Sequence, residues 1–331
     1  MRRRGAGASA VLALLLAAPA CRPGGNATSG GPVLLRMLVP ANERPFWLPL
    51  AETFAEARPG VRLALEEGPV PTDLRESLTT SALLSRDGAY DLVYLDVTWT
   101  SKLAAAGWLL PLDGVFGETE RAAFLPQALD AGVFRGRLYR VPFRTDVGLL
   151  YYRADLLEEA GIDPPRTFAA LEAAARRLQS PPDRWGFLWQ GAQYEGLVCF
   201  FLEVLHGHGG SWIDPGTLEV GLDRPEAEAA LAFLVHARGV GGISPPGVTA
   251  YREEETRHLF QSGRAVFLRS WPYVFRLAQR EESAVAGKVG VLPVPTLSGA
   301  PGSGTLGGWG LAVARASRRP EEAIAFVRHA T

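Results

Sequence analysis

The stretch Arg140-Val-Pro-Phe-Arg-Thr-Asp-Val-Gly-Leu-Leu-Tyr-Tyr-Arg153 decides how the rest of the chain is interpreted. Two apolar, strand-like runs, one ending at Val141 and one beginning at Val147, flank a polar segment that holds Arg144 and Asp146. Such runs favour strands, so we expect the polar pair on an extended connection between two bodies of structure. The pair is either part of a ligand site or an exposed ion pair of little energetic value.

The length and charge of the chain narrow its possible functions. With 331 residues, 47% of them hydrophobic, the chain is long enough to form two lobes. Its 34 Lys and Arg residues balance 35 Asp and Glu residues, which gives a formal net charge of -1. Because such a chain has no basic field for a polyphosphate, a nucleic-acid partner is not expected.

The first residues have the pattern of a secretory signal. Three arginines precede an apolar run, residues 8–18, that is too short to cross a bilayer as a structural helix. The run ends in Ala18-Pro-Ala-Cys21, which resembles the lipobox of bacterial lipoproteins, with alanine where leucine is usual. We expect a signal peptide at 1–20, then a lipidated Cys21 and a flexible tether, together residues 21–32. An ordinary signal cleavage beside an incidental cysteine is the alternative.

The remaining cysteine and the histidines predict no metal site. Cys199 lies in the apolar segment Val198-Cys-Phe-Phe-Leu202 and is expected to pack as a small core residue. His206 and His208 lie in a Gly-rich segment where a helix C-terminus is expected, without acidic or cysteine companions. No metal and no cofactor are therefore expected.

Predicted strands and helices alternate from Val33 onwards, with a hairpin expected at 134–142. Strands are expected at 33–39, 61–65, 91–95, 185–189, 266–269, 288–295 and 306–314. Helices are expected at 46–58, 73–84, 98–106, 154–160, 168–178, 195–205, 226–237, 253–261, 273–280 and from 321 onwards. Asp73-Leu-Arg-Glu76 has the pattern of a capping box. The alternation predicts an α/β fold with mainly parallel sheets flanked by helices.

Five segments occur in the same order in one protein family. They are Asp91–Asp96 with Trp99 and the following Ala-Ala-Gly-Trp-Leu, Val141–Leu157, Phe260–Phe267, Ser270–Tyr273 and Gly307–Ala312. From Val33 to Thr331 the chain resembles the extracellular solute-binding proteins of bacterial carbohydrate ABC importers, most of all the trehalose/maltose-binding branch. The resemblance implies a type II periplasmic-binding-protein-like fold of two lobes with a ligand cleft between them. Lobe one is expected at 33–142 plus 291–331, and lobe two at 143–290.

The resemblance also implies a set of ligand-binding residues. Asp96 and Asp146 match carboxylates that bind sugar hydroxyls, and we expect one on each side of the cleft. The other matched positions are Glu43, Arg75, Trp271, Tyr273, Gly308 and Trp309. Close relatives have tyrosine at the position of Arg144, a departure that bears on which sugar binds.

The residue types fit the chemistry of sugar binding. A sugar presents hydroxyl edges and apolar faces, so its site needs carboxylate acceptors, polar donors and flat aromatic rings. We expect Trp271 and Trp309 to supply such rings, and Trp108, Trp185 and Trp212 to belong to the core.

The resemblance implies a non-enzymatic, monomeric, substrate-binding lipoprotein. It would capture a mono-, di- or oligosaccharide, such as trehalose or maltose, outside the cell and deliver it to transmembrane permease subunits. The lipid would hold it at the outer face of the cytoplasmic membrane or in the periplasm. Family members usually continue past the helix near Pro320, so we expect the C-terminal helices of lobe two to be absent.

Two other functions stay open at this point. A glycoside hydrolase would use Asp96 and Asp146 as its pair of carboxyl groups. A bilobal ferric-ion receptor is suggested by the adjacent Tyr151 and Tyr152, although neighbouring strand residues point to opposite faces.

Overall fold

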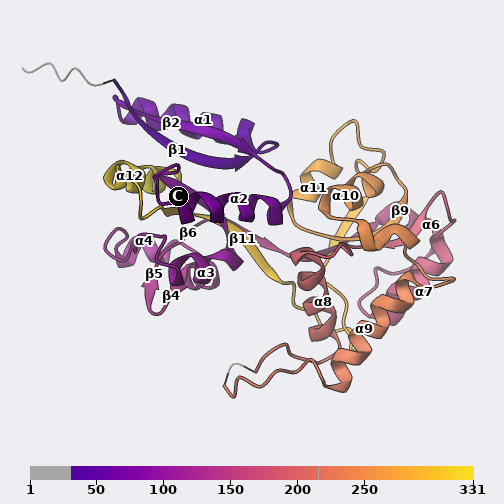
Figure 1. The fold of residues 1–331 in the computed structure, drawn as a ribbon. Helices are drawn as coiled ribbons and strands as arrows, with labels where there is room; N and C mark the ends of the chain where they lie inside the picture. The colour runs from indigo at the N-terminus through magenta and orange to yellow at the C-terminus, as the bar shows by residue number, and fades with distance from the viewer. Residues whose placement is uncertain (1–30, 215) are drawn as a thin grey trace, which may run out of the picture.

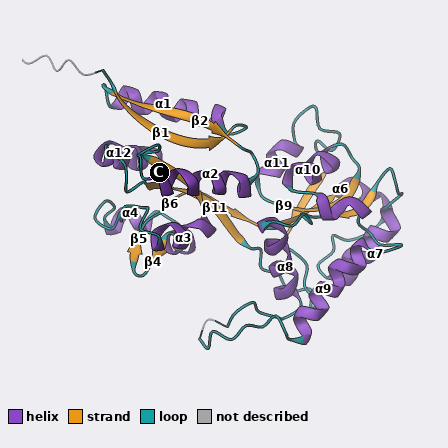
Figure 2. Cartoon of the chain, in the orientation of Figure 1, coloured by secondary structure: helices purple, strands orange, loops and turns teal. Residues whose placement is uncertain are grey.

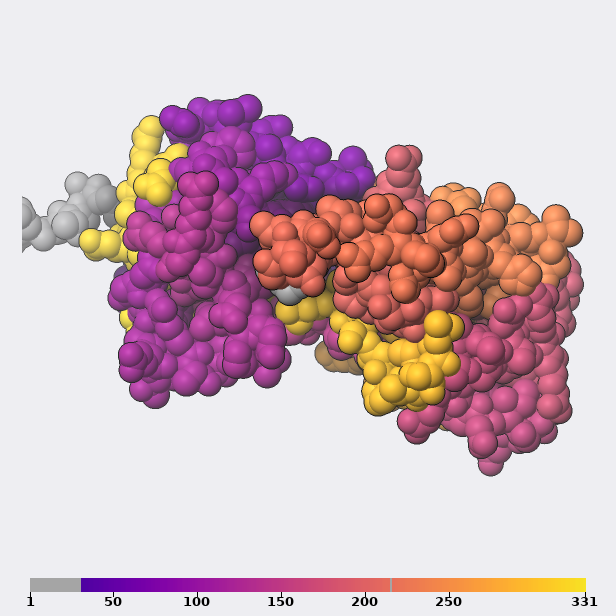
Figure 3. All heavy atoms as spheres, turned by 90° about the horizontal axis from the view of Figure 1, so that it is seen from below, coloured from indigo at the N-terminus to yellow at the C-terminus, as the bar shows by residue number. Residues whose placement is uncertain are grey.

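The computed structural model describes residues 31–214 and 216–331, which form two α/β lobes side by side (Figures 1 and 2). The expected signal peptide, Cys21 and nearly all of the tether lie outside the described residues. Figure 3 shows the lobes from below: an indigo-to-magenta body at the left, with yellow C-terminal atoms beside it, and a pink-to-orange body at the right.

The first lobe is built on a five-stranded sheet in the order β2-β1-β3-β11-β6. Its strands are β1 (Val33–Pro40), β2 (Val61–Gly68), β3 (Leu92–Asp96), β6 (Val141–Val147) and β11 (Leu306–Val313). Its helices are α1 (Arg44–Ala57), α2 (Thr72–Ser85), α3 (Thr100–Ala105), α4 (Glu118–Ala122), α5 (Pro126–Asp130) and α12 (Pro320–Ala330), with the 3-10 turn η1 (Val97–Trp99). A hairpin of β4 (Val133–Phe134) and β5 (Arg137–Leu138) lies at its edge.

The second lobe is built on a four-stranded sheet in the order β10-β7-β9-β8. Its strands are β7 (Leu149–Arg153), β8 (Trp185–Leu188), β9 (Ala265–Ser270) and β10 (Val289–Leu292). Its helices are α6 (Ala154–Ala160), α7 (Phe168–Leu178), α8 (Glu195–Gly207), α9 (Pro225–Arg238), α10 (Glu253–Gln261) and α11 (Tyr273–Ala278), with the 3-10 turn η2 (Pro246–Ala250).

Both sheets are mixed, which corrects the expectation of mainly parallel sheets. In the first sheet β1 runs parallel to β2 and β3, but β11 is antiparallel to both β3 and β6. In the second sheet β8 and β9 are parallel, whereas β7 is antiparallel to β9 and β10. Each antiparallel pair within these two sheets includes β11 or β7. These are the strands by which the chain returns from the second lobe and enters it.

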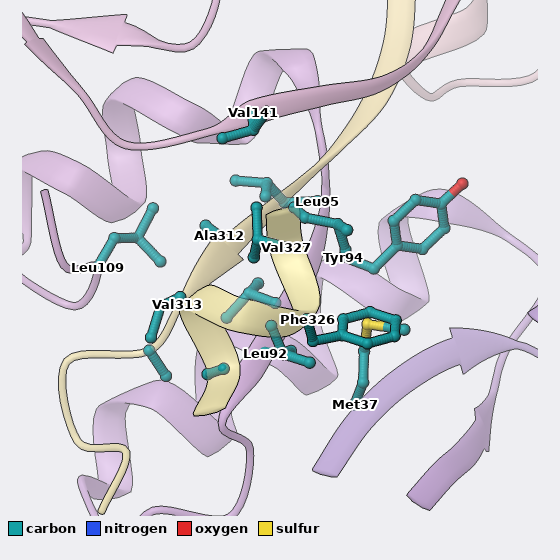
Figure 4. Close-up of a cluster of buried hydrophobic side chains, with 14 of the residues drawn as sticks. Met37, Leu92, Tyr94, Leu95, Leu109, Val141, Ala312, Val313, Phe326 and Val327 are labelled. Atoms are coloured by element: carbon teal, nitrogen blue, oxygen red, sulfur yellow. The ribbon is translucent and has the colours of Figure 1, made fainter. Parts of the chain in front are cut away.

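The core of the first lobe joins distant parts of the chain (Figure 4). Met37, Leu92, Leu95 and Val313 come from three strands of the sheet and are almost completely buried. Phe326 of α12 packs edge-on to Phe54 of α1 with ring centroids 5.1 Å apart. Buried aromatic and aliphatic side chains of this size are each worth about 1.5–3 kcal/mol. The last helix of the chain is therefore part of the first lobe.

The stretch that decides the fold is one strand, a break and a second strand. We expected Arg144 and Asp146 on a connection between two strands, but both lie inside β6. Gly148 then separates β6 from β7, and its amide donates to the carbonyl of Thr305 at 3.2 Å. The prediction missed this because the backbone pairing of β6 with β11 overrides the polar character of its side chains.

The predicted lobe boundaries at 142/143 and 290/291 do not coincide with sheet membership. β6 continues to Val147 in the first sheet, and β10 continues to Leu292 in the second. The following loop still contacts the second lobe, since the amide of Leu297 donates to the carbonyl of Gly207 at 2.9 Å. We propose that the lobes meet at Gly148 and at Thr305.

Candidate functional site

Three neighbouring strands bring the matched residues of the first lobe together. In the register of the sheet Trp309 of β11 lies opposite Asp96 of β3 on one side and Arg144 of β6 on the other. Asp146 lies opposite Gly307. Asp96 and Asp146 therefore flank β11 within one sheet, and the expectation that they come from different lobes is wrong. The cause is again that β6 belongs to the first sheet along its whole length.

Arg144 is the centre of an ion cluster with two carboxylates. Its Nη1 lies 3.1 Å from Oε1 of Glu43, and its Nε lies 3.3 Å from Oδ2 of Asp146. The Tyr94 hydroxyl donates to the other oxygen of Glu43 at 3.1 Å. Burial raises the pKa of the Asp146 carboxyl, although the Arg144 guanidinium opposes that shift. The cluster offers hydroxyl groups both acceptors and donors.

Trp309 is 6% exposed and packs between aromatic and cationic side chains. Its ring centroid is 4.8 Å from that of Tyr94 and 5.5 Å from that of Trp99. The guanidinium carbon of Arg75 lies 4.4 Å from the Trp309 ring centroid, and that of Arg144 lies 5.9 Å away. The ring is therefore buried in this structure and not the open platform that the sequence suggested.

Asp96 and Arg75 are both buried beside this ring. Asp96 accepts from the amide of Thr98 at 3.0 Å and from its hydroxyl at 3.1 Å, while burial raises the pKa of its carboxyl. Arg75 donates to the carbonyls of Pro69 and Val70, each at 2.8 Å. Its Nε has no hydrogen-bond partner within the described residues. A buried donor without a partner is costly, so this atom suits a ligand oxygen.

Gly308 lets the strands that carry the cluster approach one another. Its φ of +138° is a conformation that L side chains rarely adopt, and an added Cβ would lie 2.5 Å from the Arg144 carbonyl oxygen. The matched glycine thus fixes the position of Arg144 through the backbone.

The second lobe contributes Trp271 and Tyr273 at the start of α11. The Trp271 indole N–H donates to Glu253 at 3.4 Å, and its carbonyl accepts from the Tyr151 hydroxyl at 2.8 Å. A Cβ added to Gly307 of β11 would lie 3.1 Å from the Trp271 ring, so this ring reaches the first lobe's returning strand. Tyr273 is 37% exposed, and its hydroxyl donates to Glu254 at 2.9 Å.

Sequence reasoning missed Glu195, the first residue of α8. Burial and the carboxylates of Asp96, Glu253 and Glu76 raise the pKa of Glu195 to about 8. Asp96 belongs to the first lobe and Glu195 to the second, so acidic groups of the two lobes act on each other. In the sequence Glu195 is recognisable only as the first residue of an expected helix, and a helix start does not by itself indicate a binding site.

Asp73 has a different role from the predicted one. The residue before α2 is Pro71, whose side chain cannot accept a hydrogen bond, so no side chain caps this helix. Asp73 binds Arg252 instead, the residue just before α10. The two Asp73–Arg252 hydrogen bonds measure 2.7 and 3.1 Å, and the Arg252 guanidinium lies 4.9 Å from the Tyr194 ring centroid. This ion pair joins the two lobes directly.

Several other expectations are settled by burial. Cys199 is buried, as predicted. Trp108 and Trp185 are half-buried, but Trp212 is 37% exposed, so its assignment to the core is wrong. It lies on the loop after α8, where the following residues Ile213, Leu218 and Val220 are exposed as well.

Metal binding and membrane crossing can be tested on residues 31–214 and 216–331. Within them no cluster of three or more His, Cys, Asp or Glu side chains could hold a metal ion. Tyr151 is buried and bonds to the Trp271 carbonyl, whereas the ring of Tyr152 lies against Gly290; the two tyrosines do not converge. No helix in this part of the chain is long and apolar enough to cross a membrane.

Comparison with known proteins places this geometry in a family. Residues 40–331 match the family model of the bacterial extracellular solute-binding proteins. A probable ABC transporter-binding protein of Deinococcus radiodurans is 34% identical over 82% of this chain and 65% of its own length. A mannitol-binding protein of Pseudomonas aeruginosa is 29% identical over 85% of this chain and, again, 65% of its own length.

A solved structure shows the same fold. Maltose-bound T. maritima MalE3 superposes with a TM-score of 0.84 at 37% identity, covering 90% of this chain and 76% of the other. The two-lobed α/β expectation is confirmed by this likeness. The chain spans slightly less than two thirds of the length of the curated relatives named above.

Proposed function

Because the chain belongs to the bacterial extracellular solute-binding protein family, we propose that it captures a sugar outside the cell and delivers it to the permease subunits of an ABC importer. The observation that carries the proposal is the convergence of polar and aromatic groups from both lobes on β11. The Glu43–Arg144–Asp146 cluster and Asp96 come from the first lobe, and Trp271 comes from the second. Family members are binding proteins, so we propose no catalytic role for Asp96 and Asp146.

The ligand we propose is a di- or trisaccharide. MalE3 is bound to maltose, and a maltotriose-binding protein of Pyrococcus abyssi is 26% identical over 81% of this chain. A sugar alcohol is the competing class, since the Pseudomonas relative is named for mannitol. Carboxylates suit either ligand, but a ring sugar also presents an apolar face that Trp271 can stack against.

We propose distinct roles for the matched residues. Asp96, Asp146 and Glu43 accept from ligand hydroxyls, and Arg75 and Arg144 donate to ligand oxygens. Aromatic contact comes from Trp271, Tyr273 and an edge of Trp309, while Gly308 supplies backbone. Closure of the lobes over the ligand would be driven by contacts that exist only when both lobes touch it.

Calorimetry with maltose, trehalose, sucrose, maltotriose and mannitol tests this function. Asp146→Asn and Asp96→Asn should each weaken the best ligand by about thirtyfold, since a lost charged acceptor costs about 2 kcal/mol. Asp113→Asn is the matched control, because Asp113 pairs with Arg137 on the same lobe, beside the β4–β5 hairpin. Binding of no ligand in the set, or full binding by both site variants, would refute the proposal.

Arg144 should decide which ligand binds best. Arg144→Tyr removes the cation shared by Glu43 and Asp146 and frees both carboxylates for hydroxyl groups. We expect the order of the five ligands to change in the same calorimetric series. An unchanged order would mean that Arg144 only balances charge.

Incubation of the protein with maltose tests the hydrolase alternative, because a hydrolase that uses Asp96 and Asp146 would release glucose.

We also propose that Cys21 carries two acyl chains and that the protein stays at the outer face of the cytoplasmic membrane. Two chains are needed because one binds a membrane only marginally. After export from cells, Cys21→Ser should appear in the soluble extracytoplasmic fraction. Retention of that variant in the membrane would show that lipid is not the anchor.

A further inference from the structure

A fully buried ion pair lies inside the second lobe. Arg269 of β9 and Glu203 of α8 have side chains that are 1% and 0% exposed. The Arg269 Nε donates to Glu203 Oε2 at 2.8 Å, and its Nη2 contacts the other carboxylate oxygen. The remaining terminal nitrogen, Nη1, donates to Gln190 at 3.2 Å. Burying two charges is costly, and such pairs can often be replaced by apolar residues without loss of stability, so stability alone does not account for it.

Glu203 also holds both connections between the lobes. Its Oε1 accepts from the amide of Thr305 at 3.0 Å, just before β11 begins. The Thr305 carbonyl in turn accepts from the amide of Gly148 at 3.2 Å. A Cβ added to Gly148 would lie 1.8 Å from Glu203 Oε1, so the carboxylate is in direct contact with the first connection as well. The two crossings are thus packed against one side chain.

Arg269 carries this contact to the ring that faces the first lobe. Its guanidinium carbon lies 4.2 Å from the Trp271 ring centroid, a distance at which a cation and an indole attract each other. The connection that contains Thr305 continues into β11, and there Gly307 comes close to the same Trp271 ring. A continuous set of contacts therefore runs from Thr305 and Gly148 through Glu203 and Arg269 to Trp271.

We propose that Glu203 and Arg269 are positioning residues for ligand binding, which couple the Trp271 ring to the two connecting strands. The proposal rests on the proposed function, because Trp271 has a ligand to position only if the sugar lies against it. When the connections change direction during lobe closure, the Thr305 amide moves against Glu203, and Arg269 transmits that movement to the indole. An apolar pair would fill the same volume but would neither accept from Thr305 nor hold the ring.

The first test needs no ligand. In Glu203→Met/Arg269→Met, hydrogen exchange at the Thr305 amide should become about tenfold faster, as a net hydrogen bond of ordinary strength is lost. Acrylamide should quench Trp271 more strongly, with Trp271→Phe identifying its share of the fluorescence. Asp91→Asn is the control: Asp91 is buried in the first lobe and accepts from Arg36 and Ser317, so it should change the melting temperature but neither of these two signals.

The second test is a double-mutant cycle with maltose as the probe. Arg269→Lys, which keeps the charge and removes the flat guanidinium, should weaken maltose about tenfold. In a Trp271→Ala background the same change should weaken it less than twofold. Equal losses in both backgrounds would show that the pair is merely structural and would overturn the proposal.

The two tests separate this proposal from the proposed function. If wild type binds none of the five ligands, the proposed function is refuted, while exchange at Thr305 and quenching of Trp271 still decide the role of the pair. If Glu203→Met/Arg269→Met does not fold, Glu203→Gln replaces it: this variant keeps an acceptor for Thr305 but removes the charge that holds Arg269, so exchange at Thr305 should stay the same while quenching of Trp271 increases. Unchanged exchange and quenching in the folded double variant, or unchanged quenching in Glu203→Gln, would overturn the coupling.

Discussion

Two arginine–carboxylate pairs lie where the lobes of this protein meet, and their environments differ. Arg269 and Glu203 have 1% and 0% of their side-chain surface exposed, whereas Arg252 and Asp73 have 31% and 43% exposed. The buried pair packs against the two covalent connections, and the exposed pair bridges α2 and α10 without any covalent link. Similar chemistry should therefore set the geometry of the hinge at one place and only bias the opening of the lobes at the other.

The largest effect should come from breaking the buried pair on one side. Arg269→Met leaves Glu203 charged and buried without its partner, so the free energy of unfolding should fall by about 3–5 kcal/mol. Urea unfolding at neutral pH measures this loss. Glu203→Met in the same chain should recover most of it, since an apolar pair replaces an uncompensated charge. A single variant as stable as wild type would mean that water reaches Glu203.

The contrast also shows what the sequence can predict. Local signals worked well: the helices expected at 154–160 and 168–178 are α6 and α7. Gly161 ends α6 with a φ of 63°, and Thr167 caps α7 by accepting from the amide of Ala170 at 3.0 Å. The pattern also located the helix that contains Cys199. These features depend on residues within four positions of one another, so the sequence displays them directly.

Pairings between distant residues were not predictable in the same way. Asp73 has the spacing of a capping box, but its partner Arg252 lies 179 residues further on. The family resemblance implies that Asp146 lies in the second lobe, whereas pairing with β11 holds it in the first sheet. For Arg144 the family resemblance indicated an unusual residue, yet only the fold shows that Glu43 and Asp146 share its charge.

A smaller effect should come from the acidic groups of the two lobes. Burial and the carboxylates of Asp96, Glu253 and Glu76 raise the pKa of Glu195 to about 8, above the ordinary 4.5. A raised carboxyl pKa stabilises the fold fully below the ordinary value, and this contribution is lost as the pH rises to about 8. We expect a loss on the order of 2 kcal/mol, less than the full shift implies, because separation of the lobes relieves part of the repulsion.

Glu195→Gln isolates this pH dependence. Its uncharged amide should make the free energy of unfolding flatter between pH 5 and 8.5 than in wild type, as measured by urea titration at each pH. Glu172→Gln serves as a control, since Glu172 pairs with Arg176 on the surface of the second lobe. Parallel wild-type and Glu195→Gln profiles would show that Glu195 does not titrate in this range.

The smallest effect on stability should come from the exposed Asp73–Arg252 pair, which should mainly influence how far the two lobes open. Arg252 lowers the pKa of Asp73, so the pair is ionised at neutral pH and weakens only in acid. Because solvent screens it, Asp73→Asn should change the free energy of unfolding by less than about 1 kcal/mol. It should nevertheless shift the ligand-free protein towards open lobes in small-angle scattering, and raising the salt concentration should shift wild type in the same direction.

Asp73→Arg combined with Arg252→Asp should restore the wild-type profile, while Arg137→Gln, which breaks a comparably exposed pair within the first lobe, should leave it unchanged. A scattering profile that does not respond to Asp73→Asn would mean that the Asp73–Arg252 pair has no influence on how far the lobes open. The packing of the two connections against Glu203 and Arg269 would then determine it alone.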